Sequence, residues 1–284
     1  MIFLRCRPEC YSCLEKLAER TARGAGGDRQ ALKAGLAFLE ANFDYRRIPT
    51  ILAGEIQRVI RKEAKNPDPF AAIKEKEMPL GRMLAEKYAL PREASLEEAV
   101  AFAAKGNSLD FFLELDLMEK EMAKPVEFVR NDVPQLLSLL EGEGEREKTI
   151  IFCADNAGEC YFDLPLYRKL SRWGKVYYAA KDSPVQNDLT VADLGRSGIA
   201  HLFDRVVSTG SDTPGLDPAL CSPRFLELLK EADLVVAKGM GNYETIPEMS
   251  LQVPVFLILK AKCQPVASDL GVPLNSYVAV LMKP

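Results

Sequence analysis

The chain has 284 residues, of which 48% are hydrophobic and 27% are charged, and its 41 acidic and 37 basic side chains give a formal net charge of −4. A chain of this length and composition can bury a full hydrophobic core, which excludes the disordered and collagen-like classes. Neither half carries the basic excess with which nucleic-acid-binding proteins displace counterions, so we expect no nucleic-acid partner.

The chain has a single histidine, His201, and seven cysteines. One histidine cannot build the zinc sites that need two or three histidine ligands. The residues around His201 are typical of the approach to a strand, where we expect a half-buried structural histidine. Any catalysis is therefore expected to depend on carboxylates, amides, lysines or thiols.

No segment is typical of a membrane span or of an export signal. The longest apolar stretch, residues 253–259, is interrupted by Pro254 and is much shorter than the ~20 residues that cross a bilayer. We therefore expect no membrane partner and a cytoplasmic location, in which the cysteines are reduced thiols.

The first half of the chain has a helical pattern, in which apolar residues such as Leu32 and Leu36 recur at intervals of three and four. Residues 141–148 then combine two glycines with charged side chains and no core-forming residue, which is typical of a solvated link. We therefore predict two domains, an all-helical domain over residues 1–145 and an α/β domain over residues 146–284.

After this link, short apolar runs alternate with helical stretches, which is the pattern of parallel β-α-β units. The predicted fold is a Rossmann-like α/β/α sandwich of three layers with about six mainly parallel strands. Ligands bind such sheets beyond the carboxyl ends of the strands, so the candidate site residues should lie there. The predicted strands are residues 149–154, 176–180, 205–207, 234–237, 255–259 and 277–282.

Polar segments follow four of the predicted strands. Asp155 and Asn156 follow the first strand, and Asp188 lies in the loop after the second. An Asp-Asn pair after a strand is by itself usually a turn or a helix cap. Convergence of these oxygens on one edge of the sheet, however, favours a site for Mg²⁺ or Mn²⁺, which prefer carboxylate, carbonyl and water ligands.

Lysines and glycines at the same edge would suit a phosphoryl group. Lys238 and Lys260 end neighbouring runs and can neutralise phosphate charge, while Gly210, Gly239 and Gly241 let backbone amides approach its oxygens. Carboxylates for a metal, together with lysine and glycine for phosphate, indicate phosphoryl transfer.

Five spaced motifs of the sequence resemble those of the DUF89 family, whose members are metal-dependent phosphatases related to the damage-control phosphatases. The resemblance covers nearly the whole chain and is closest to the short prokaryotic branch that carries a CxxC pair, here Cys10 and Cys13. The motifs are DNAGE at 155–159, ND at 187–188, KGMGNYE at 238–244, LKAKC at 259–263 and GNSLD at 106–110.

The resemblance implies that Asp155, Asn156 and Asp188 hold a divalent cation, namely Mg, Mn, Co or Ni, and take part in catalysis. It implies no particular substrate. For Glu159 and Glu244, a favourable charge in the first turn of a helix explains the residue at least as well as substrate contact. The residues that the resemblance implies at the substrate or its phosphate are Lys238, Asn242, Lys260, Asn107, Asp110, Glu159 and Glu244.

The N-terminal cysteines allow two further interpretations. Cys6, Cys10 and Cys13 have the C-x₃-C-x₂-C spacing with which radical SAM enzymes hold an iron–sulfur cluster. Only five residues precede Cys6, however, whereas that motif normally follows the first strand of a barrel, so we disfavour this alternative. The other interpretation is a structural metal or redox site formed by Cys10 and Cys13, with Cys6 and the distant Cys263 as further members.

We therefore predict a metal-dependent phosphoric monoester hydrolase that acts on a small phosphorylated metabolite, such as a sugar phosphate, in metabolite damage control. Asp155 as a covalent nucleophile stays open, but haloacid-dehalogenase phosphatases need a second aspartate two positions later, where this chain has Ala157. The alternative is a non-catalytic metabolite- or nucleotide-binding module. Classical dinucleotide binding is weakly supported, since position 244, where a third glycine would follow Gly239 and Gly241, is a glutamate.

Overall fold

A computed structural model describes residues 4–108, 115–142 and 146–284 of the chain. In this part of the chain seven strands form one sheet. The strands are β1 (Phe128–Asn131), β2 (Lys148–Cys153), β3 (Gly174–Ala180), β4 (Val206–Ser208), β5 (Leu234–Lys238), β6 (Val255–Lys260) and β7 (Tyr277–Met282). The helices are α1 (Pro8–Gly24), α2 (Arg29–Asn42), α3 (Pro49–Glu63), α4 (Ala71–Lys87), α5 (Leu96–Ser108), α6 (Leu115–Ala123), α7 (Val133–Glu141), α8 (Cys160–Leu170), α9 (Val191–Arg196), α10 (Pro223–Glu231), α11 (Gly239–Thr245) and α12 (Gln264–Leu270), with the 3₁₀ helices η1 (Ala157–Glu159), η2 (Ala200–Leu202) and η3 (Ile246–Met249).

The strand order in the sheet is β1-β7-β6-β5-β2-β3-β4. β2 lies in the interior of the sheet and pairs in parallel with both β3 and β5, so that Ile151 stands opposite Tyr177 on one side and Val235 on the other. Among the described strand pairs, only β6 and β7 are antiparallel. The predicted α/β fold with a mainly parallel sheet is confirmed.

The sheet also includes a strand that the sequence did not predict. Residues 128–131 were expected in the all-helical region, but they form β1, which pairs in parallel with β7 at the edge of the sheet. Three of the four residues of β1 are exposed, so this segment lacks the apolar run that marks a buried strand. Pairing with β7 makes it a strand, and the sheet therefore extends across the predicted boundary at residue 145. The division into two domains stays a prediction.

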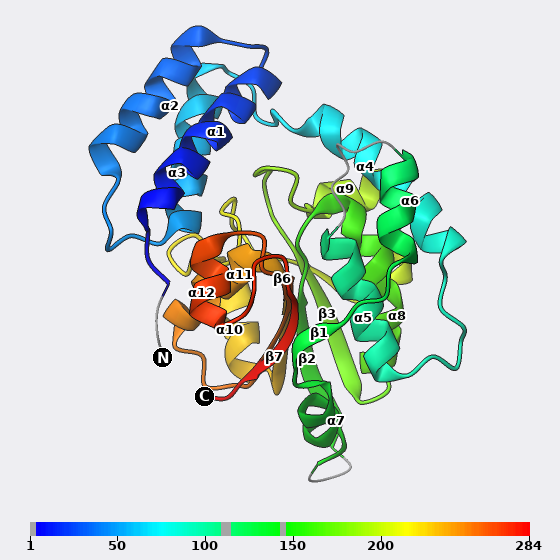
Figure 1. Ribbon diagram of the computed structural model, residues 1–284. Coiled ribbons are helices and arrows are strands. Elements are labelled where there is room, and N and C mark those ends of the chain that lie inside the picture. The colour runs from blue at the N-terminus through cyan, green and yellow to red at the C-terminus, as the bar shows by residue number, and fades with distance from the viewer. Residues whose placement is uncertain (1–3, 109–114, 143–145) are drawn as a thin grey trace.

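Helices cover both faces of the sheet (Figure 1). Successive side chains of a strand point to opposite faces, and a sheet covered on both sides buries both sets. Ile150 and Phe152 of β2 thus join the core under α5 and α8, whereas Ile151 and Cys153 join the core under α10 and α12.

The first three helices form a separate cluster with a hydrophobic core of their own, beside α11 and α12 (Figure 1). α2 begins after Asp28, whose carboxylate accepts hydrogen bonds from the backbone N–H groups of Gln30 and Ala31. Gly35 of α2 lies against Ile60 of α3, where a Cβ would approach the isoleucine side chain to 2.6 Å. The glycine therefore permits the close packing of α2 on α3.

Two further sequence expectations concern the surface. No helix in the described ranges is long and apolar enough to cross a membrane. His201 lies in η2 ahead of β4, as expected, but its side chain is exposed and its Nδ1 lies 2.6 Å from the carbonyl oxygen of Gly198. The prediction that His201 is half-buried is wrong, because a short surface turn precedes the strand.

Candidate active site

The candidate site lies where the chain changes direction across the sheet. From β2 the chain builds β3 and β4 on one side, and it later adds β5 and β6 on the other side. The carboxyl ends of β2 and β5 therefore flank a topological switch point, the place where ligands bind open α/β sheets. Asp155 follows β2 here and Gly239 follows β5. Gly239 has a φ of +81°, and a Cβ on it would lie 1.9 Å from Asp155 Oδ2. Both the positive φ and this close approach therefore require glycine.

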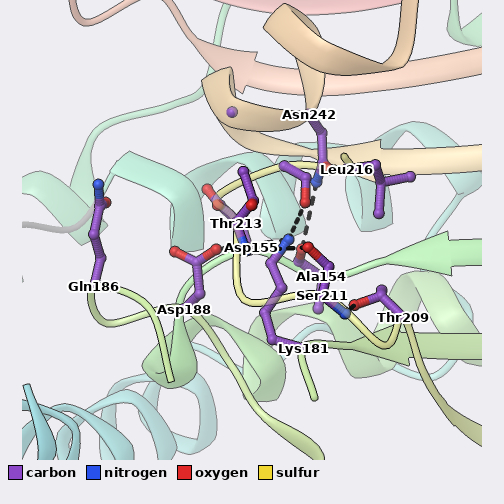
Figure 2. A network of polar contacts seen from close by, with 12 residues as sticks. Ala154, Asp155, Lys181, Gln186, Asp188, Thr209, Ser211, Thr213, Leu216 and Asn242 are labelled. Carbon is purple, nitrogen blue, oxygen red and sulfur yellow. Dashed lines mark hydrogen bonds and ion pairs between the residues drawn. The ribbon is translucent and has the colours of Figure 1, made fainter. Parts of the chain in front are cut away.

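The loops after β2 and β3 are joined by a short antiparallel bridge between Asn156 and Asp188. The backbone N–H of Leu189 donates to the Asp155 carbonyl at 2.8 Å, and that of Ala157 donates to the Asn187 carbonyl at 2.8 Å. Figure 2 shows Asp188 beside Asp155 at this bridge. The structure thus brings together the three residues predicted to hold a cation.

Asp155 is held by a side chain from the helical part of the chain. Asn107 of α5 donates its Nδ2 to Asp155 Oδ2 at 2.7 Å, and its Oδ1 accepts from the backbone N–H of Lys260 at 3.3 Å. Burial, followed by the nearby carboxylates of Glu159 and Asp188, raises the pKa of Asp155 well above its ordinary value. The site therefore concentrates negative charge that only a cation or a proton can offset.

Asp188 is buried, and its Oδ2 has no hydrogen-bond partner among the described residues. Lys181 Nζ lies 3.8 Å from this oxygen, too far for a hydrogen bond, and donates instead to the carbonyl of Gly215 (Figure 2). Burial raises the pKa of Asp188 to about 6. Lys181 was not among the predicted site residues, although its place directly after β3 was a signal for it.

Two predicted phosphate contacts lie behind the site. Lys238 is fully buried, and its Nζ lies 2.6 Å from both Glu159 Oε2 and Asp163 Oδ1. Burial disfavours its charge, but these two carboxylates outweigh burial and raise the pKa of Lys238. The alternation of β5 explains the position, because Lys238 points to the same face as Val236, under α8. Asn242 is also buried and donates to the Lys238 carbonyl at 2.7 Å.

Lys260, the third predicted phosphate contact, is half-buried, and its ammonium lies 5.1 Å from the centre of the Tyr277 ring. Burial lowers the pKa of Lys260. Lys262, two residues later, instead reaches the cavity described below. Asp110 lies outside the described residues.

A cavity of about 530 Å³ opens in front of Asp155. Its floor is the sheet edge with Asp155, Asn156 and Asp188, and its opposite wall is α1. Of the predicted substrate contacts, Asn107 and Glu244 also line it. Residues that the sequence did not single out but that line the cavity include Lys16, Arg20, Thr50, Gln186, Lys262 and Gln264.

Glu244 joins α11 to α3 at the border of the cavity. Its Oε2 accepts hydrogen bonds from the backbone N–H of Thr50 at 3.2 Å and from the Thr50 hydroxyl, at the start of α3. Burial raises the pKa of Glu244 to about 7. Glu159, in contrast, lies behind the floor, where it pairs with Lys238 and accepts from Asn156 Nδ2 at 2.7 Å.

The predicted cysteine cluster borders the same cavity. Cys10, Cys13 and Cys263 line it, and the buried Cys6 is hydrogen-bonded to Cys10. The cysteines are free thiols. Within the described ranges, no three His, Cys, Asp or Glu side chains are arranged to hold a metal ion, so a metal at the cysteines has no preformed site there. The candidate set Asp155, Asn156 and Asp188 has only two carboxylates, which suits Mg²⁺, because this ion keeps several water ligands.

Comparison with known proteins decides the family. Residues 6–278 match the family model of the damage-control phosphatase ARMT1-like domain. The chain belongs to this family. The predicted membership of the DUF89 phosphatases is thereby confirmed. The radical SAM alternative is wrong, since the chain has an open-sheet phosphatase fold in which Cys10 and Cys13 lie within α1, not after the first strand of a barrel.

Relatives match over almost their whole length. The chain is 33% identical to a damage-control phosphatase from Pyrococcus horikoshii over 97% of both chains, and 28% identical to one from Archaeoglobus fulgidus over 99% of this chain and all of that one. The crystal structure of a DUF89 family protein from Pyrococcus horikoshii superposes with a TM-score of 0.86 at 32% identity, covering 98% of this chain and 99% of the other. The named relatives indicate a phosphatase.

Proposed function

We propose that this protein is a divalent-metal-dependent phosphatase that hydrolyses a small phosphorylated metabolite, such as a sugar phosphate, in the cavity between the sheet edge and α1. The named relatives are damage-control phosphatases, and we extend that role to this chain.

The observation that carries the proposal is the buried Oδ2 of Asp188, which has no hydrogen-bond partner among the described residues. A buried carboxylate oxygen without a partner is costly, so native proteins nearly always provide one. Asp155 and Asn156 lie beside it at the bridge between the two loops. A hard divalent cation is the partner that would satisfy such a set of oxygens, and Asp155, Asn156 and Asp188 would hold it.

When bound, a divalent cation supplies Lewis-acid stabilisation of the negative charge that develops on the phosphoryl oxygens. The chain's own residues orient the carboxylates and neutralise negative charge. Asn107 fixes the Asp155 carboxylate by its 2.7 Å hydrogen bond, and the Lys181 ammonium lies close to Asp188. Lys262 reaches the cavity as an exposed cation and would contact the phosphate. Lys238 lies behind the floor and positions the Glu159 carboxylate through their ion pair. A second ion pair, with Asp163, fixes the lysine itself.

The size of the cavity limits the substrate. About 530 Å³ admits a metabolite of roughly drug size or smaller. The floor is acidic, whereas Lys16 and Arg20 on the opposite wall are basic. A cation bound at the floor would offset the carboxylates and place the phosphate there, with the remainder of the molecule against α1.

The test is hydrolysis of p-nitrophenyl phosphate by metal-free protein, to which Mg²⁺, Mn²⁺, Co²⁺ or Ni²⁺ is added singly. We expect turnover with at least one metal, loss with EDTA and recovery on re-addition. A panel of sugar phosphates and nucleotides then ranks substrates by kcat/KM. Metal-replete protein that binds members of this panel without hydrolysing any of them would instead support the non-catalytic binding module.

A further inference from the structure

Two cysteine side chains are hydrogen-bonded to each other at the cavity wall, Cys6 just before α1 and Cys10 in its first turn. Cys10 and Cys6 are only 8% and 3% exposed, and Cys10 lines the cavity whereas Cys6 lies behind it. The Cys6 thiol is hydrogen-bonded to the Cys10 sulfur. The backbone N–H of Arg7 also donates to Cys10 Sγ, at 3.4 Å. Two donors therefore converge on one sulfur, which is the arrangement that stabilises a thiolate.

Because these hydrogen bonds favour a charged Cys10 sulfur, the two thiols differ in charge state. The hydrogen bond from Cys6 lowers the pKa of Cys10 to about 6, against the opposing effect of burial. The same contact raises the pKa of Cys6. Other charges act on Cys10 more weakly, since Glu9 raises its pKa and Arg7 lowers it. Across the cavity, burial raises the pKa of Glu244, and the charge of Cys10 adds to this increase. At neutral pH the pair thus consists of one thiolate and one thiol.

We propose that Cys10 is a reactive thiolate that hydroperoxides oxidise, and that Cys6 is its resolving partner. A thiolate with access to solvent and a neighbouring thiol is the arrangement found at redox-sensitive cysteines. Neither residue belongs to the phosphatase floor, so this modification site is a property of the α1 wall. It does not depend on the proposed function.

The chemistry balances with hydrogen peroxide as the oxidant. The Cys10 thiolate attacks one peroxide oxygen, an S–O bond forms, the O–O bond breaks, and hydroxide leaves and takes up a proton to become water. Cys6 then loses its proton and attacks the Cys10 sulfur, an S–S bond forms, the S–O bond breaks, and a second hydroxide leaves and is protonated to water. Two thiols are oxidised and one peroxide is reduced to two waters.

Cys6 is favoured over the other neighbours because it is hydrogen-bonded to Cys10. Cys13 is exposed one helical turn further along α1, and Cys263 precedes α12 on the other side of the cavity. Burial raises the pKa values of both and the charge of Cys10 adds to the increase, but neither donates a hydrogen bond to Cys10. A disulfide between Cys6 and Cys10 therefore requires the smallest movement of the sulfurs.

The first experiment treats the reduced full-length protein with one equivalent of hydrogen peroxide and labels the remaining thiols with iodoacetamide. The tryptic peptide of residues 6–16 contains Cys6, Cys10 and Cys13. We expect it to carry one label, on Cys13, and three labels after dithiothreitol. Cys13→Ser should keep the disulfide, whereas Cys6→Ser should lose it and leave a sulfenic acid on Cys10 that dimedone traps. A Cys10–Cys13 or Cys10–Cys263 disulfide, or a fully labelled peptide, overturns the proposal.

A second experiment measures the alkylation rate of Cys10 against pH. A thiol with the ordinary pKa of ~8.5 reacts about 75-fold faster at pH 8 than at pH 6, whereas Cys10 should change only about twofold. Cys6→Ala, which removes the donor, should restore a steep profile. Cys6→Ser keeps a hydroxyl donor and should stay shallow, although it cannot form the disulfide. A steep profile in the unmodified protein, or no difference between the alanine and serine variants, contradicts the assignment.

Discussion

The floor and the α1 wall of the cavity differ in how their charged side chains are held. At the floor and directly behind it, charged side chains are held by partners from other elements, as Asp155 is by Asn107 and Lys238 by Glu159 and Asp163. On the wall, Lys16 and Arg20 are exposed, and neither forms a hydrogen bond or ion pair within the described parts of the chain. The comparison teaches that the floor is preorganised for one chemistry, whereas the wall is free to adapt to a ligand.

The largest effect should come from removing the buried cation behind the floor. Lys238→Met leaves Glu159 and Asp163 buried without their partner, so we expect a loss of about 3–5 kcal/mol in the free energy of unfolding. Lys16→Met on the wall is the matched control and should change stability by less than about 0.5 kcal/mol. Urea denaturation measures both. Equal losses in the two variants would remove the contrast between floor and wall.

The next effect concerns activity. Asp188→Asn removes the charge of a buried candidate ligand, and we expect metal-supported kcat/KM to fall at least about 100-fold, which corresponds to ~2.7 kcal/mol. Asp182→Asn, at an exposed position earlier in the same loop, should stay within about twofold. The assay is p-nitrophenyl phosphate hydrolysis, with circular dichroism to verify folding. Near-normal activity of Asp188→Asn would exclude Asp188 from the site.

Glu244 lines the cavity between floor and wall and is bonded to α3, and the protonation of its carboxylate should change the free energy of unfolding with pH. Its folded pKa of about 7 lies above the ordinary value of 4.5, so the folded state holds this proton more tightly. Its contribution is therefore fully present below about pH 4.5 and is lost as the pH rises through about 7. Glu244→Gln does not titrate, so its stability should fall by about 2 kcal/mol less than that of the unmodified protein between pH 5 and 8. Parallel urea titrations at the two pH values would check this, and identical pH dependence would contradict it.

The smallest expected effect on stability comes from two glycine substitutions. Together they separate the cost of backbone strain from the effect of a new side-chain contact. Gly239→Ala and Gly271→Ala both place an alanine at positive φ, +81° and +66°, and backbone strain alone should cost about 1–2 kcal/mol at each. Only at Gly239 does the new Cβ meet the Asp155 carboxylate, whereas nothing lies within 4 Å at Gly271. Activity should therefore fall in Gly239→Ala alone. Equal activity of the two variants would show that Asp155 moves aside without consequence.

Much of the fold could be predicted because it depends on local pattern. Apolar runs between helical stretches predicted six of the seven strands of the described sheet. The positions of Asp155, Asn156 and Asp188 after two of these strands predicted that they meet at one edge, as they do. β1 was missed because its residues are mostly exposed and only pairing with β7 makes them a strand. His201 was misjudged for a similar reason, since local sequence does not report the exposure of a short turn.

By itself, the sequence determined which residue types stand at the carboxyl ends of the strands, the mainly parallel sheet and the family. These follow from periodicity and from the order of motifs, which are written along the chain. Only the tertiary structure decided that Lys238 pairs with buried carboxylates while Lys181 lies beside Asp188. It also decided that Cys6 is hydrogen-bonded to Cys10, which lines the same cavity. The physical reason is that burial and pairing depend on residues distant in the chain, which α5, α8 and α1 bring together only when the protein folds.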